Sequence, residues 1–170
     1  MRWDRLLAEI EASALDEAAL ERDALAVELT DEEWSGARIR DLVWGDVALD
    51  VRGVGWVEGR VLRSTEEFMV LAEAAREIVV ARAALLGWRG GSGRAPEPRG
   101  VEARLGWAQL LRALRDEGEP VCVVRTDGVA VTGVVGAVTR EAVRLEGSGE
   151  ENPGSPVWVV LTAVATLHVL

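Results

Sequence analysis

Few residues of this 170-residue chain have the side chains that catalysis needs. His168 is the single histidine and Cys122 the single cysteine, which excludes an internal disulfide, a cysteine-rich zinc site and most metal sites within one copy. Both residues lie in apolar segments that predict strands, and no serine has the surroundings of a nucleophile elbow. We therefore expect a protein that is not an enzyme, with no catalytic residues, no metal and no cofactor.

Arginine is the only side chain here that could bind phosphate in quantity, because the chain contains no lysine. The 29 acidic residues outnumber the 19 arginines, and the net charge of −10 disfavours nucleic acid. Six arginines nevertheless lie close together in sequence, beside Trp88 and Trp107, where an arginine and aromatic strip could follow a single strand. These candidate nucleic-acid residues are Arg89, Arg94, Arg99, Arg104, Arg112 and Arg115.

Helical periodicity appears in three segments of the sequence. Residues 1–30 form an acidic arm rich in Ala, Leu and Glu, with one apolar face, and predict a helix. A capping box at Thr30 predicts a short helix that reaches Leu42. Residues 101–117 predict a third helix, for which Gly118 is a suitable C-terminal cap before Pro120.

Alternating apolar residues predict short strands between and after these helices. The predicted strands cover residues 47–51, 56–63, 68–72 and 78–84, and strands resume at residue 121. Residues 87–98 are rich in Gly, Pro and Ser and predict a linker, whose bounds we set at residues 89–100.

An internal repeat links the two strand-rich segments. A shift of 74 residues places Gly59 on Gly133, as well as Val61 on Val135, Glu67 on Glu141 and Leu71 on Leu145. Six extra residues in the second copy then change the shift to 80, which places residues 79–84 on residues 159–164. We expect a mainly β fold with helices (α+β), in which the acidic arm precedes two small barrels. The first helix and barrel span residues 31–88, and the second pair spans residues 101–170.

Each copy resembles an Sm-like small β-barrel, which is also an SH3-like fold. Gly128 fits the glycine that opens the first turn of that family, and Gly133 fits the glycine that follows five residues later. Gly59 is the first-copy equivalent, at a position where a missing side chain permits the sharp bend that closes the barrel. The layout also resembles uncharacterised two-barrel proteins of high-GC bacteria.

The RNA-contacting residues of the Sm-like family are not preserved. Thr65 and Thr139 stand where that family has an aspartate, and Met69 and Val143 stand where it has an asparagine. Arg82 occupies a polar position of the first copy. The resemblance therefore implies the fold without the uridine pocket.

The uncharged segment 158–167 would aggregate as a bare sheet edge, so we expect it, or residues 79–85, to pair across a barrel–barrel contact. We favour pairing between chains. The candidate interface residues are Val79, Val80, Arg82, Val159, Val160 and Leu161. The favoured function is a non-catalytic binding or scaffolding module whose partner is a protein or a second copy in a homo-oligomer. The alternative is RNA or single-stranded DNA binding. The start of the sequence lacks an apolar signal-peptide core, and we expect a cytoplasmic protein with no membrane segment.

Overall fold

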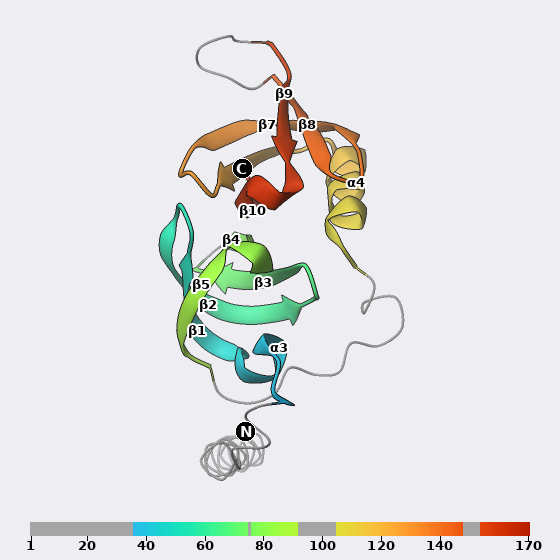
Figure 1. The fold of residues 1–170 in the computed structure, drawn as a ribbon. Coiled ribbons are helices and arrows are strands. Elements are labelled where there is room, and N and C mark those ends of the chain that lie inside the picture. The colour runs from blue at the N-terminus through green and yellow to red at the C-terminus, as the bar shows by residue number, and fades with distance from the viewer. Residues whose placement is uncertain (1–35, 75, 92–104, 148–153) are drawn as a thin grey trace, which may run out of the picture.

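The computed structural model describes residues 36–74, 76–91, 105–147 and 154–170, so the acidic arm of residues 1–30 lies outside the described part. Within that part, ten antiparallel strands form one open sheet in the order β5-β1-β2-β3-β4-β10-β6-β7-β8-β9 (Figure 1). The strands are β1 (Gly45–Val51), β2 (Gly55–Ser64), β3 (Phe68–Glu73), β4 (Arg76–Ala81), β5 (Leu85–Gly90), β6 (Pro120–Arg125), β7 (Ala130–Val138), β8 (Ala142–Glu146), β9 (Val157–Val160) and β10 (Val164–Val169). The expected mainly β fold with helices is confirmed.

The sheet consists of two equivalent five-stranded halves, β1–β5 and β6–β10. Val47 pairs with Gly59 in the first half, and Val121 pairs with Gly133 in the second. Val121 lies 74 residues after Val47, and Gly133 lies 74 residues after Gly59. This confirms the predicted shift and the equivalent positions of the two glycines. Gly128 lies in the turn before β7 with φ +87°, as the turn prediction requires.

The shift of 80 predicted for the later part of the repeat is wrong by one residue. Phe68 pairs with Ala81, and its counterpart Ala142 pairs with Val160, so the shift there is 79. Nearly every residue of this segment is apolar, and the sequence therefore aligns almost equally well in either register. The difference matters because a slip of one residue moves every side chain of a strand to the other face.

The linker also begins later than predicted. The predicted strand 78–84 ends at Ala81, and a 3-10 turn (Arg82–Ala84) leads into β5, which contains Gly87 and Gly90. These glycines suggested a linker, but they pair with Asp50 and Val47 of β1. Pairing in the sheet outweighs local composition here. Residues 92–100 of the predicted linker lie outside the described part.

Two helices appear in the described residues. The first, α3 (Ile39–Leu42), is a separate single turn after the non-helical residues 37–38, so the predicted helix from Thr30 to Leu42 is not continuous, although it ends at the expected residue. The second, α4 (Trp107–Glu117), begins after the non-helical residues 105–106, and Gly118 closes it at φ +72°, as predicted. Neither helix is long and apolar enough to cross a membrane.

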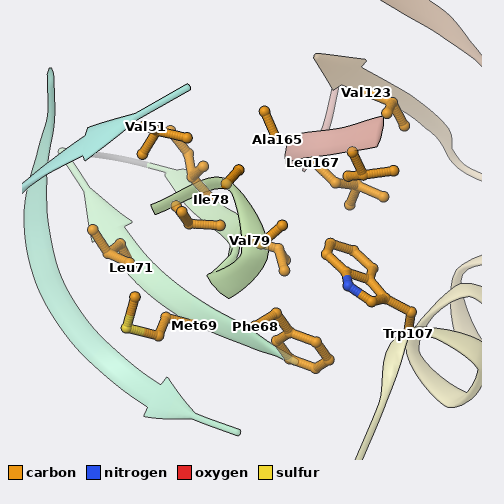
Figure 2. Close-up of a cluster of buried hydrophobic side chains, with 14 of the residues drawn as sticks. Val51, Phe68, Met69, Leu71, Ile78, Val79, Trp107, Val123, Ala165 and Leu167 are labelled. Carbon is orange, nitrogen blue, oxygen red and sulfur yellow. The ribbon is translucent and has the colours of Figure 1, made fainter. Parts of the chain in front are cut away.

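The two halves join through β4 and β10 of the same chain. Val79 pairs with Leu167 and Val80 with Thr166, so a contact between halves covers this strand, as expected. The expectation of pairing between chains is wrong for β4. Figure 2 shows Val79, Ala165 and Leu167 gathered beside Trp107 at this junction. All four side chains are buried, and they make the two halves share one hydrophobic core.

Helix α4 strengthens the junction because the first half caps its N-terminus. The N-cap residue Gly106 has no side chain to act as a cap. The main-chain N–H of Trp107 donates instead to Glu67 Oε2 at 2.5 Å. The ring of Trp107 packs against Phe68 with centroids 5.3 Å apart. A carboxylate at a helix N-terminus also interacts favourably with the helix dipole.

Replacing Glu67 with alanine is expected to lower the free energy of unfolding by about 1–2 kcal/mol, because the variant loses this cap between the halves. Urea unfolding of the full chain measures the effect. Glu141→Ala is the matched control, since Glu141 occupies the same position in the second half and is exposed. Equal losses in the two variants would contradict the proposed role of Glu67.

Candidate interaction surface

The two outermost strands, β5 and β9, are the free edges of the sheet within the described residues. β5 pairs only with β1, and β9 pairs only with β8, whereas every other described strand has two neighbours. A strand with one neighbour presents a row of main-chain N–H and C=O groups to any further strand. These two strands are called the edge strands below.

Edge strand β9 carries no charged residue to protect it. Val159 points into the core, while Trp158 and Val160 are half exposed on the other face. Arg144 of β8 pairs with Trp158 in the ladder and places its guanidinium 5.9 Å from the centre of the indole ring. The cation–π contact holds the indole against β8, so that an apolar surface remains ordered at the edge.

Edge strand β5 also carries exposed apolar side chains. Leu86 and Trp88 are both exposed, and they lie two residues apart on the same side of the strand. The side chain of the next residue, Arg89, lies on the other face, where its guanidinium carbon is 4.3 Å from the centre of the Trp56 ring. β5 therefore presents a leucine and a tryptophan beside its free main-chain groups.

The six predicted interface residues do not form one surface. Val79 and Val80 are buried in the β4–β10 junction, and Arg82 Nη1 donates to the Thr65 carbonyl at 2.8 Å. The second-half candidates lie at or next to the free edge: Val159 is buried in the core, Val160 is exposed and Leu161 is intermediate.

Sequence reasoning missed Leu86, Trp88 and Trp158 as exposed edge residues. Leu86 and Trp88 lie at the boundary assigned to the linker, and the register error hid the correspondence of Trp158 with Val79. The uncharged segment 158–167, predicted as a single sheet edge, is not one strand: β9 ends at Val160 and is the free edge, whereas β10 begins at Val164 and lies between β4 and β6.

Four residues that the sequence resemblance aligned with RNA-contacting positions, Thr65, Met69, Thr139 and Val143, have structural roles in this fold. The Thr65 hydroxyl accepts the Phe68 N–H at 3.0 Å, and the Thr139 hydroxyl accepts the Ala142 N–H at 2.9 Å. Met69 and Val143 are completely buried. These four residues thus build two identical turns and two core positions rather than a polar pocket.

The predicted arginine strip is not assembled by its described members. Arg89 lies on β5, at the opposite side of the molecule from α4, which carries Arg112 and Arg115 (Figure 1). Arg115 also binds the carboxylate of Asp116 at 2.8 Å. The other three members, Arg94, Arg99 and Arg104, lie outside the described residues.

Cys122 and His168 are direct neighbours across the β6–β10 ladder, a proximity that the sequence did not predict. Burial raises the pKa of the Cys122 thiol and lowers the pKa of the His168 imidazole, and the nearby Arg76 also lowers the latter. Both groups therefore remain neutral, whereas a catalytic pair needs a thiolate. No cluster of three or more metal-binding side chains occurs in the part of the chain that the structure describes.

His168 is expected to make stability depend on pH. Its pKa in the folded chain is lower than the ordinary 6.5, chiefly through burial and Arg76, although Glu73 opposes the shift. As pH falls, the unfolded chain therefore protonates this imidazole before the folded chain does, so the His168 contribution to stability is present above pH 6.5 and is lost as pH falls below 6.5 through the lower pKa of the folded chain. Urea unfolding at pH 7.5 and 5.5 should show a smaller acid loss in His168→Gln than in the wild type. An equal acid loss in both proteins would contradict this assignment.

A shallow, open depression lies over β1 and β2. Charges of both signs line it, including Asp46, Glu58, Arg60 and Arg89. The Asp46 carboxylate and the Arg60 guanidinium approach to 4.0 Å, so they largely neutralise each other. The depression lacks the enclosure of a small-molecule site.

No protein-family model matches the chain, and no curated protein is significantly similar to it.

Proposed function

We propose that this chain is a non-catalytic binding and scaffolding module that acts through protein–protein contacts at its edge strands. The observation that carries the proposal is the pair of free edges, β5 and β9, each with large apolar side chains exposed beside unpaired main-chain groups. A protein strand added to such an edge gains main-chain hydrogen bonds, and the exposed side chains give specificity.

We further propose that each half is an Sm-like small barrel. The repeated strand order within the halves supports this proposal, as do the register shifts in the second strand of each half, between Val61 and Arg63 and between Val135 and Val138. Gly59 supports it too, because an ideal Cβ there would lie 2.5 Å from the Ala72 carbonyl oxygen of β3. Bulges and a glycine at a close backbone approach are features that let a short sheet bend sharply.

Binding of RNA or single-stranded DNA is the rival function. The net charge of −10 opposes it, and within the described part of the predicted strip Arg89 on β5 is separated from Arg112 and Arg115 on α4. The positions that would read a base hold threonines engaged in turns and two buried apolar residues.

The test has two arms that separate these functions. Single-stranded RNA labelled with a fluorophore is titrated with the full chain at 50 and 200 mM salt, and we expect no salt-dependent binding. In parallel, protein captured from the native host is compared between the wild type, Trp158→Glu and the control Leu62→Glu. Leu62 is an exposed residue of β2, away from both edges. Capture that is lost only in Trp158→Glu supports the proposal, whereas steep salt-dependent RNA binding would favour the rival.

A further inference from the structure

The β1–β2 turn (residues 52–54) and the β6–β7 turn (residues 126–129) of the two halves meet main chain to main chain. An ideal Cβ on Gly53 would lie 2.6 Å from the carbonyl oxygens of Arg125 and Thr126. One on Gly128 would lie 3.3 Å from the Gly53 carbonyl oxygen. At these distances no side chain lies between the two turns. Figure 1 shows the β1–β2 turn reaching toward the second half.

The two turns are equivalent in the repeat, and each is tied to the last strand of its own half. Arg52 and Thr126 occupy the same position at the 74-residue shift. Their N–H groups donate to the carbonyls of Ala84 and Ala163, respectively, each at 2.8 Å. Each alanine ends the 3-10 turn that leads into β5 or β10. A displacement of either turn therefore pulls directly on edge strand β5 or on β10 at the junction.

The other contacts between the halves restrict their relative angle less. The β4–β10 ladder holds two residue pairs, whereas β10 pairs with β6 of its own half at five positions. The core at the junction consists of side chains, and packed side chains can slide past one another. Glu67 holds helix α4 at the N–H of Trp107 alone. The contact between the turns lies beyond the end of the short ladder and adds a fixed point.

We infer that the two turns form a latch that fixes the angle between the halves, and with it the angle between edge strands β5 and β9. With the latch closed, the halves move as one body. With the latch open, they rock about the short β4–β10 ladder. The consequence for the edges rests on the proposed function: a scaffold whose two edges are held at one angle orients the proteins bound to them, without an ordering cost at binding.

Two neighbouring glycines of the β1–β2 turn provide a matched pair of variants, Gly53→Ala and Gly55→Ala. Gly53 has φ +78° and Gly55 has φ +90°, so both variants carry the same kind of backbone strain. The Cβ of Gly53→Ala also collides with the main chain of the second half, whereas a Cβ at Gly55 has no atom within 4 Å. A difference between the two variants therefore reports the contact between the turns.

Distances between two nitroxide spin labels on the full chain measure the angle between the halves. The labels are attached at Leu62→Cys and Arg140→Cys, exposed positions on different halves, in a Cys122→Ser background. An excess of unlabelled chain suppresses distances between molecules. We expect one narrow distance distribution for the otherwise unaltered chain and for Gly55→Ala, whereas Gly53→Ala should broaden the distribution or shift its maximum. A broad distribution in the unaltered chain, or an unchanged one in Gly53→Ala, would overturn the inference.

Hydrogen exchange of the unlabelled full chain is the second measurement. Amides of the β4–β10 ladder should exchange about tenfold faster in Gly53→Ala than in Gly55→Ala. Gly128→Ala is a milder variant that keeps the test decisive if Gly53→Ala does not fold, and its effect should lie between the other two because its Cβ contact is 3.3 Å. Equal exchange in all folded variants would contradict the latch. Protein capture tested with Trp158→Glu involves neither turn, so failure of the latch leaves the proposed function standing.

Discussion

Replacing Trp107 with alanine should lower the free energy of unfolding by about 3–5 kcal/mol, the largest loss that we expect from any single substitution. The indole is almost fully buried between the two halves, where it packs against Phe68 beside Val79 and Leu167 (Figure 2). Its removal leaves a cavity at the junction of the two halves. Urea unfolding of the full chain measures the loss.

Trp107→Ala is also expected to change the cooperativity of unfolding. With the wild-type Trp107, we expect both halves to unfold in one cooperative transition, since they share one core. Trp107→Ala should separate the transitions detected by different probes, because the halves become less coupled. Trp56→Ala is the control: Trp56 is exposed on β2 and should cost less than about 1 kcal/mol. Similar losses for the two tryptophans would refute the role of Trp107.

Replacing Gly59 with valine should cost more than about 2 kcal/mol. A Cβ at this position would lie 2.5 Å from the Ala72 carbonyl oxygen, and that oxygen belongs to the β3 backbone, which cannot move without opening the β2–β3 ladder. Gly133→Val, at the equivalent ladder position of the second half, is also expected to exceed the ~1 kcal/mol typical of strand glycines, because bulk at this position opposes the bend of the strand.

Gly87→Val is the matched control for Gly59. Gly87 is also a strand glycine, but an added Cβ there has no atom within 4 Å. Its thermal and urea unfolding should change by less than about 1 kcal/mol. If Gly59→Val is as stable as Gly87→Val, the close approach of β2 to β3 does not restrict the residue at position 59.

The sequence alone determined the mainly β class, the duplication and the positions that depend on local backbone chemistry. Gly118 was recognisable as a helix C-cap because a left-handed residue before Pro120 favours glycine. Gly59 and Gly133 could be matched because the apolar residues that follow them in the sequence have the same spacing in both copies. Such features depend on short stretches of chain, where composition and spacing carry enough information.

The tertiary structure decided which strands meet and which stay free. Gly87 and Gly90 belong to β5 because β1 supplies their partners, although the local sequence is typical of a linker. The register of β9 depends on its ladder with β8, since a run of apolar residues fits either register equally well. Val79 and Trp158 occupy the same position of the repeat, yet one is buried and the other half exposed. Their environments differ because β10 packs beside β4, and no described strand packs beside β9.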